Sequence, residues 1–305
     1  MTEAEAGIAP TGTRDVPVAL HVPRPDRPAR IAVQVKPQHA SYAELRAAVV
    51  AAEEAGADVV LGWDHFFPLS GDPDGAHLEA WSLLAAFAEV TERVELGVLV
   101  SSTGYRNPQL LADMARTVDH ISARDGGPGR VVLGIGAGWF ERDYEEYGYE
   151  FGTAPDRLRR LRADLPLIRE RWSKLNPPPT RAIPVLIGGG GEQVTLRIVA
   201  EHADIWHGFG DAETIAHKHA VLDDWCRRIG RDPADIERSA GVSPKPGRYA
   251  EDLDDYAGHA EALHVVGTRL FTVGLEAETG WDLGPIRELV AWRDEVNART
   301  VGAAG

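Results

Sequence analysis

Eight short apolar runs, separated by longer segments of helical periodicity, constrain the fold more than any other feature of this chain. The runs are rich in β-branched residues and occupy 31–35, 57–61, 94–99, 131–135, 184–187, 204–206, 236–242 and 268–273. Most of them are apolar at consecutive positions, which is typical of parallel strands that are covered on both faces. The sequence therefore predicts a parallel sheet.

Eight helices are predicted to follow these strands, at 41–55, 78–90, 108–122, 154–172, 192–202, 213–229, 252–264 and 284–299. In the first of them Ser41 and Glu44 have the spacing of a capping box, and Gly56 stands where a helix C-cap is expected. Parallel strands need crossover helices, and eight strand–helix units close a (β/α)8 TIM barrel. We predict this α/β fold; an open doubly wound sheet is the alternative topology.

Residues 1–30 have a different character from the rest of the chain. They include five prolines: Pro10, Pro17, Pro23, Pro25 and Pro28. Because proline fixes φ and lacks an N–H donor, regular structure is not expected there. We predict a flexible N-terminal tail over 1–30 and a single barrel domain over 31–305.

Charge and cysteine content exclude several classes of partner and compartment. The chain has 47 acidic and 32 basic residues, and its net charge of −15 opposes binding to nucleic acid and to anionic membrane surfaces. The single Cys226 cannot form an internal disulfide. No apolar run is long enough to span a membrane, and the N-terminus does not resemble a signal peptide. We expect a soluble, cytoplasmic protein that acts on a small molecule.

Catalytic residues of a (β/α)8 barrel follow the C-terminal ends of its strands. In this chain those positions hold glycines, aromatic residues and a few polar groups. They comprise Lys36, Gln38, His39, Trp63, Asp64, His65, Phe66, Phe67, Ser101, Ser102, Thr103, Gly104, Tyr105, Arg106, Asn107, Gly136, Ala137, Gly138, Trp139, Gly188, Gly189, Gly190, Gly191, Trp206 and His207.

Two glycine clusters at these positions indicate where an anionic ligand would bind. Four successive glycines, Gly188–Gly191, precede a predicted helix, and exposed amides at a helix N-terminus favour a phosphate. A flexible loop or a tight turn explains the same run equally well. The spaced glycines at 134, 136 and 138 lack the acidic residue that a dinucleotide fingerprint requires.

The adjacent Asp64 and His65 form the strongest titratable pair at the predicted barrel mouth. Histidine exchanges protons near neutral pH, and a carboxylate accepts hydrogen bonds from a ring edge. The structural alternative is a helix-capping aspartate beside a histidine satisfied by its neighbours. The aromatic residues Trp63, Phe66, Phe67, Trp81 and Trp139 would either wall a flat ring or belong to the core.

Hydrolytic chemistry has little support in the sequence. His217 and His219 are two positions apart within a predicted helix, so they point to different sides and do not form a metal site. No H-E-x-x-H or G-x-S-x-G motif is present, and Cys226 falls within a helical pattern. We therefore expect no metal, and a metal-dependent hydrolase is the least favoured function.

Five segments together resemble a known family. They are W-D-H-F at 63–66 and the longer stretches at 105–122, 131–148, 184–206 and 266–275. The chain resembles the luciferase-like flavin and deazaflavin oxidoreductases, in particular the actinobacterial subgroup that uses coenzyme F420. This resemblance implies a (β/α)8 barrel with the cofactor's tricyclic ring in the mouth, against a bulge that ends the third strand. A non-prolyl cis peptide is expected there, near Ser101 and Ser102.

The resemblance also assigns roles to residues. Asp64 and His65 match the family's pair beside the ring, Gly136, Ala137 and Gly138 match the loop along the ribityl chain, and Gly188, Gly189, Gly190 and Gly191 match the phosphate loop. Together with Ser101, Ser102, Asn107 and Trp139, these are the predicted cofactor-binding residues. His65 is the predicted catalytic residue that stabilises or protonates the substrate, and Asp64 is predicted to hold the ring or the imidazole.

Three departures from the family pattern stand out. Gly104 replaces a polar or bulky residue, and the turn at 122–130 is longer, with an expected effect on the surface alone. The connection at 173–181 is shorter, which is expected to open the mouth or change substrate access.

The predicted function is hydride transfer between C5 of F420 and a small organic substrate. The alternatives are a monooxygenase that uses reduced FMN and a non-catalytic deazaflavin-binding protein. A homodimer is expected by analogy with relatives.

Overall fold

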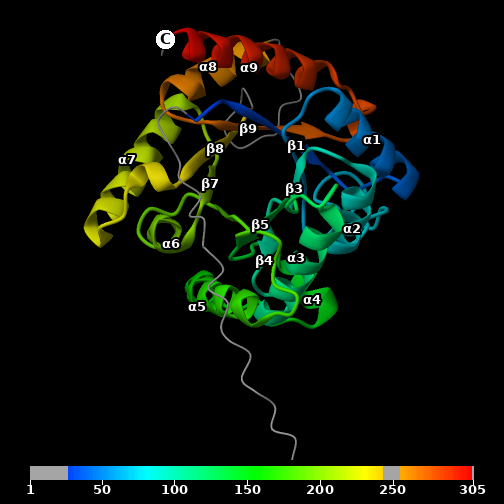
Figure 1. The fold of residues 1–305 in the computed structure, drawn as a ribbon. Coiled ribbons are helices and arrows are strands. Elements are labelled where there is room, and N and C mark those ends of the chain that lie inside the picture. Colours follow the sequence, from blue (N-terminus) through cyan, green and yellow to red (C-terminus); the bar gives the residue numbers. More distant parts are fainter. Residues whose placement is uncertain (1–26, 243–254, 304–305) are drawn as a thin grey trace, which may run out of the picture.

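The computed structural model describes residues 27–242 and 255–303, and within these ranges nine parallel strands form one closed sheet (Figure 1). The strands are β1 (Arg30–Val35), β2 (Val59–Gly62), β3 (Glu95–Val98), β4 (Ser101–Ser102), β5 (Val131–Gly136), β6 (Val185–Gly188), β7 (Ile205–Gly208), β8 (Glu237–Gly241) and β9 (Leu270–Leu275). Their order is β3-β2-β1-β9-β8-β7-β6-β5-β4, and β3 also pairs with β5.

Strands β3 and β4 together fill one position of the barrel. Leu96 of β3 pairs with Val131 of β5, and Ser101 of β4 pairs with Ile135 further along the same strand. The pairing of β3 with β5 closes the sheet into an eight-position barrel, which confirms the predicted fold class and excludes the open sheet. The predicted non-prolyl cis peptide is present in the bulge between the two strands, where it joins Leu99 to Val100 directly before Ser101.

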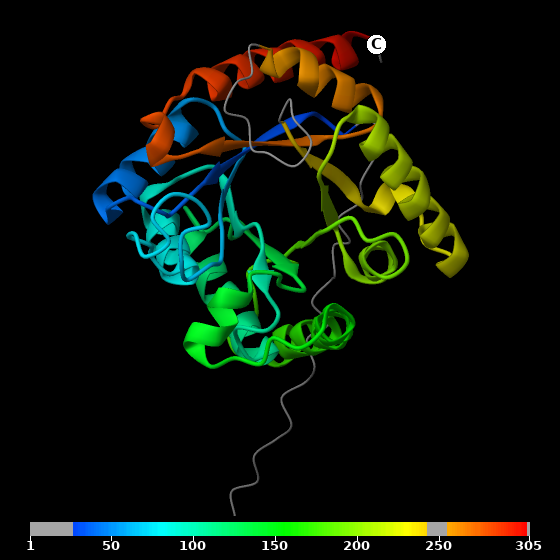
Figure 2. The ribbon, with the colours of Figure 1, turned by 180° about the vertical axis from the view of Figure 1, so that it is seen from behind.

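Helices surround the barrel, as the two opposite views show (Figures 1 and 2). They are α1 (Tyr42–Glu54), α2 (Ala80–Val90), α3 (Pro108–Ser122), α4 (Glu141–Tyr147), α5 (Ala154–Lys174), α6 (Thr195–His202), α7 (Ala212–Ile229), α8 (Tyr256–Val265) and α9 (Gly284–Ala303), with 3₁₀ turns at Pro233–Asp235 and Ala277–Thr279. None of these helices is both long and apolar enough to cross a membrane.

All eight predicted helices are present in this structure, and α4 is an additional one. Helix α6 begins three positions later than predicted, because the segment after the glycines forms a turn before Thr195. The first residues of the predicted helix at 252–264 lie outside the described ranges. Ser41 and Glu44 form the predicted capping box of α1, in which the Ser41 side chain accepts a hydrogen bond from the Glu44 amide.

Two apolar layers hold the barrel together. The larger layer lies between the sheet and the helices. The smaller one fills the barrel interior and consists of Ala32, Val59, Leu61, Leu99, Val132, Leu186, Ile205 and Leu270, with Val100 packed against it. The interior is therefore filled, so ligand binding is restricted to the barrel ends.

The barrel begins slightly before the predicted boundary at residue 31. Ala29 is buried, and its backbone N–H and C=O both bond to the Asn297 side chain of α9, at 2.8 and 3.0 Å. Residues 1–26 of the predicted tail lie outside the described ranges.

The connection at 173–181 lies at the N-terminal end of the barrel. Arg181 donates to Glu95 at the start of β3 and to the carbonyl of Val131 at the start of β5, at 2.9 and 3.1 Å. Arg116 of α3 bonds to the carbonyl of Pro177. The expectation that this short connection opens the mouth was wrong, because helix-to-strand connections are at the opposite end of a barrel from the mouth.

His207 of β7 is buried inside the barrel wall. Its Nδ1 lies 2.9 Å from the Ser239 hydroxyl of β8, and burial lowers the pKa of His207 to about 4. The ring is therefore neutral at pH 7, whereas an unfolded histidine has a pKa of about 6.5.

This difference predicts a pH-dependent loss of stability. Between pH about 6.5 and 4 the unfolded chain binds a proton that folded His207 does not, so the free energy of unfolding falls as pH falls, by at most about 1.4 kcal/mol per pH unit for this site. His207→Asn should reduce that slope by about this amount, measured by chemical denaturation across the range. His120→Asn on the surface of α3 is the matched control. Equal slopes in wild type and His207→Asn would contradict the prediction.

Candidate active site

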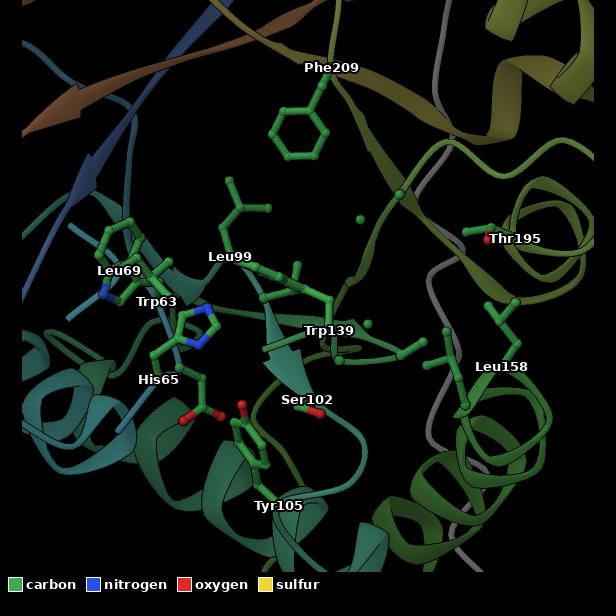
Figure 3. A pocket seen from close by; sticks show the side chains of 18 of the residues that line it. Trp63, His65, Leu69, Leu99, Ser102, Tyr105, Trp139, Leu158, Thr195 and Phe209 are labelled. Atoms are coloured by element: carbon green, nitrogen blue, oxygen red, sulfur yellow. The ribbon is translucent and has the colours of Figure 1, made fainter. Parts of the chain in front are cut away.

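A pocket opens at the C-terminal ends of the strands, where a (β/α)8 barrel carries its active site. Its cavity volume is about 510 Å³. It is lined by Lys36, Trp63, Asp64, His65, Leu69, Ser70, Leu99, Val100, Ser102, Tyr105, Gly136, Ala137, Gly138, Trp139, Leu158, Leu161, Gly188, Gly189, Thr195 and Phe209. Figure 3 shows His65 and Tyr105 on one side of this pocket and Leu158 and Thr195 on the other.

His65 follows β2, and its partner is Asp143. His65 Nδ1 lies 2.7 Å from Asp143 Oδ2, and the Asp143 carboxylate has no solvent exposure. Tyr105 donates its hydroxyl to the same oxygen at 2.6 Å, and the Phe66 amide donates to the other oxygen at 3.0 Å. Asp143 therefore fixes the edge of the imidazole that carries Nδ1 and leaves Nε2 for other contacts.

Asp64 is paired with Arg106 and not with the imidazole. Its carboxylate forms a two-pronged ion pair with Arg106, in which Nη2 lies 3.0 Å from Oδ1, and Arg106 also contacts Glu79. Burial acts to lower the pKa of Arg106, but the two carboxylates hold it above its ordinary value. Asp64 therefore does not hold the imidazole of His65, because the nearby guanidinium occupies its carboxylate, and the alternative contact of Asp64 with the cofactor ring stays a prediction.

Asp143 belongs to helix α4, which was not predicted from the sequence. Its seven residues, Glu141–Tyr147, are too few to show a periodic apolar stripe, although acidic residues occupy the first turn and Gly148 ends the helix with φ of +68°. Those end signals were the available evidence for a helix. Nothing in the local sequence links Asp143 to His65, which lies 78 positions earlier.

The departure at Gly104 has a steric reason. A Cβ at Gly104 would come within 2.5 Å of the Tyr144 ring, and a Cβ at Gly138 would come within 2.1 Å of its hydroxyl. Tyr144 is fully buried and bonds to Ser102. The two glycines therefore make room for an α4 side chain that fastens α4 to β4.

Glycines also surround Val100. A Cβ at Gly136 would lie 2.7 Å from one Val100 methyl group, and a Cβ at Gly188 would lie 3.2 Å from the other. Val100 itself lines the pocket together with Leu99. These glycines on β5 and β6 therefore let an apolar side chain reach the pocket wall.

The four glycines after β6 divide between pocket and surface. Gly188 and Gly189 line the pocket, whereas Gly190 and Gly191 lie on an exposed turn beyond it. The Gly189 amide donates to the His207 carbonyl at 3.1 Å. The amides of Gly190 and Gly191 have no acceptor within the described ranges. Thr195, the first residue of α6, also lines the pocket. It was not predicted as a site residue from the sequence.

Besides Gly190 and Gly191, two more of the predicted cofactor-binding residues, Ser101 and Asn107, lie outside the pocket lining. Ser101 is buried, and its hydroxyl accepts a hydrogen bond from Trp81 at 2.9 Å. Asn107 caps α3 by accepting from the Gln109 amide at 2.9 Å, a role that its position before Pro108 indicated. Ser102, Gly136, Ala137, Gly138 and Trp139 all line the pocket.

The aromatic residues of the predicted wall take different positions. Trp63 and Trp139 line the pocket, and Phe209 after β7 joins them. The side chains of Trp139 and Phe209 are 64% and 52% exposed, so both present large apolar surfaces at the rim. Phe66, Phe67 and Trp81 do not line the pocket; Phe66 stacks on Tyr147 with ring centroids 4.1 Å apart.

The two closely spaced histidines, which are not expected to share a metal ion, have other partners. His217 lies 3.0 Å from Glu192, and His219 lies 2.9 Å from the carbonyl of Val266. Within residues 27–242 and 255–303, no three His, Cys, Asp or Glu side chains gather as a metal site would require.

Comparison with known proteins relates this geometry to a family. The model of the luciferase-like monooxygenase family matches residues 27–294. An F420-dependent glucose-6-phosphate dehydrogenase of Amycolatopsis mediterranei (strain U-32) is 34% identical over 164 residues, which are 48% of this chain and 47% of that protein. The chain thus spans about half the length of this curated relative.

Solved structures share the fold at lower identity. An F420-dependent secondary alcohol dehydrogenase in complex with an F420–acetone adduct has a TM-score of 0.75 at 17% identity, covering 87% of this chain and 99% of that one. The F420-dependent tetrahydromethanopterin reductase of Methanopyrus kandleri has a TM-score of 0.67 at 14% identity, covering 87% and 97%. Because the family model spans nearly the whole barrel, this protein belongs to the luciferase-like monooxygenase family.

Proposed function

We propose that this protein is an F420-dependent oxidoreductase that exchanges a hydride with a small, uncharged alcohol or carbonyl compound. The observation that carries the proposal is the His65–Asp143 pair, which opens onto a glycine-lined pocket at the barrel mouth. The F420-dependent relative from Amycolatopsis mediterranei supports the choice of cofactor. Membership of the luciferase-like family does not by itself identify the cofactor, since one fold hosts several chemistries.

The residues at the mouth fit a flat cofactor with an anionic tail. A cavity of about 510 Å³ lies within the range of roughly 300–1,000 Å³ typical of such sites. Leu99, Val100 and Ala137 would contact the faces of the deazaflavin ring. The amides of Gly190 and Gly191, before the N-terminus of α6, would hold the phosphate, because a helix N-terminus favours an anion.

The charges at the pocket favour an uncharged substrate. Besides Tyr105, whose hydroxyl donates to Asp143, three titratable side chains line the described pocket, and each is bonded to a charged partner: Lys36 to Glu276, Asp64 to Arg106 and His65 to Asp143. The remaining wall is largely apolar or aromatic. A sugar phosphate would lose hydration there without gaining a free cation from these residues.

His65 is the proposed proton-exchanging residue. Its Nδ1 is bonded to Asp143, so Nε2 is the atom available to a hydroxyl or carbonyl oxygen in the pocket. When bound, F420 would supply the hydride donor or acceptor at C5 of its ring. Neutral His65 would accept the alcohol proton during oxidation, and the imidazolium would return it during reduction.

A parallel titration tests cofactor and substrate class together. The protein should bind F420 more tightly than FMN, as measured by the change in cofactor absorbance or fluorescence. With F420 it should oxidise secondary alcohols faster than glucose 6-phosphate. Preference for FMN with oxygen uptake would contradict the proposal and favour a monooxygenase. F420 binding without hydride exchange with any alcohol or carbonyl donor would instead indicate a non-catalytic binding protein.

Substitution of His65 tests the proton-exchanging role. His65→Gln should lower kcat by about 10²–10⁴-fold, because positioned acid–base catalysis contributes that much, while the Kd for F420 changes little. His120→Gln on α3, outside the pocket, is the matched control and should retain wild-type kcat. Full turnover by His65→Gln would remove His65 from the mechanism.

A further inference from the structure

The Asp143 carboxylate, which bonds to the pocket residue His65, has hydrogen-bond donors on both of its oxygens. Its two oxygens receive the Tyr105 hydroxyl, the Phe66 amide and His65 Nδ1, at 2.6, 3.0 and 2.7 Å. These three donors come from different parts of the chain, and Asp143 itself is fully buried. The Asp143 carboxylate is therefore held in one position, and it holds the His65 imidazole in turn.

We propose that Asp143 is the positioning residue for proton exchange by His65. It fixes the imidazole in the tautomer that carries its proton on Nδ1, and Tyr105 holds the Asp143 carboxylate in place. This inference deepens the proposed function and rests on it for the catalytic consequence. The tautomer itself is a property of the chain that is measured without cofactor or substrate.

The donors around Asp143 determine the tautomer. A carboxylate accepts hydrogen bonds and does not donate them, so a neutral His65 that bonds to Asp143 carries its proton on Nδ1. Burial and the neighbouring Asp143 raise the pKa of Tyr105, so its hydroxyl remains a donor at neutral pH. The Phe66 amide is a donor at every pH. The Tyr105 hydroxyl and the Phe66 amide therefore both hold in place the carboxylate to which His65 Nδ1 bonds.

The other groups near His65 do not compete for Nδ1. Burial lowers the pKa of His77 to about 4, and this neutral ring accepts a hydrogen bond from Trp63 at 3.2 Å. Asp64 is paired with Arg106. The side chains of Trp63, Trp139 and Phe140 contact the imidazole with ring centroids 6.0, 5.8 and 5.6 Å away and carry no charge.

The fixed tautomer gives the reaction a defined proton path. During alcohol oxidation Nε2 of His65 would accept the O–H proton, and the electron pair of the O–H bond would form the carbonyl π bond as the C–H bond breaks. F420, when bound, would supply the acceptor for the released hydride. The resulting imidazolium is stabilised by the adjacent Asp143 carboxylate. Reduction reverses each transfer, so protons and electrons balance in both directions.

Nuclear magnetic resonance of the side-chain nitrogens tests the tautomer directly. In ¹⁵N-labelled protein without cofactor, His65 should show a protonated Nδ1 and an unprotonated Nε2, with its signals assigned by their loss in His65→Gln. In Asp143→Asn the new amide can donate to Nδ1, so the Nε2-protonated form should appear. A wild-type His65 protonated on Nε2 would overturn the proposal, whatever cofactor the protein uses.

Kinetics of the F420-loaded protein test the catalytic consequence. Asp143→Asn should lower kcat by about 10²–10⁴-fold with KM within about threefold, as expected when a base is held in the wrong tautomer. Tyr105→Phe should lower kcat by at most about tenfold, because Asp143 keeps its other two donors. The pH profile of kcat for oxidation should shift to lower pH in Asp143→Asn, because the carboxylate that favours the imidazolium is gone.

A matched control separates positioning from stability. Asp119 is another fully buried carboxylate, which accepts from the Thr180 amide and hydroxyl at 2.8 and 2.6 Å, away from the pocket. Asp119→Asn should lower the Tm while leaving the pH profile of kcat unchanged. A wild-type pH profile in Asp143→Asn, with kcat lowered only in proportion to folded protein, would reduce Asp143 to a structural role and overturn the inference. Absence of any F420-linked turnover in wild type, with the tautomer as expected, would instead contradict the proposed function.

Discussion

The arrangement of the barrel mouth depends on one buried carboxylate. Asp143 joins the segment after β2, the segment after β4 and the helix α4, because each of them supplies a group that contacts it: His65 with Phe66, Tyr105, and Asp143 itself. A buried carboxylate without donors would be strongly destabilising. The three segments are therefore held in the one arrangement that satisfies it, and that arrangement turns the free edge of His65 toward the pocket.

Packing in the barrel wall complements this polar contact. Val100 reaches the pocket because Gly136 and Gly188 leave space for its methyl groups, and Tyr144 fastens α4 to β4 because Gly104 and Gly138 leave space for its ring. The apolar interior of the barrel lies beneath the pocket. His65 thus lies on the side of the pocket opposite Thr195, the first residue of α6 (Figure 3).

The sequence predicted those features whose physical cause is local. Short runs rich in β-branched residues at 31–35 and 131–135 predicted β1 and β5, and His65 was predicted at the mouth because it follows the end of β2 within three residues. The partner of His65 could not be predicted, because 78 positions separate it from Asp143 and α4 is too short for periodicity. Asp64 was assigned to the ring or the imidazole from its place beside His65 and from the family resemblance. Neither indicates that Arg106, 42 positions later, pairs with its carboxylate. Asn107 was assigned to the cofactor although its position before Pro108 is that of a helix cap.

A crystal structure of the protein with oxidised F420 tests the proposed site most directly. The deazaflavin ring should lie in the pocket between His65 and Thr195, with the phosphate against the amides of Gly190 and Gly191 and with Nε2 of His65 facing an open space beside C5. Asp143 should remain within hydrogen-bond distance of Nδ1. Density for F420 elsewhere on the molecule, or an imidazole turned away from Asp143 when the ring is bound, would contradict this assignment of the site.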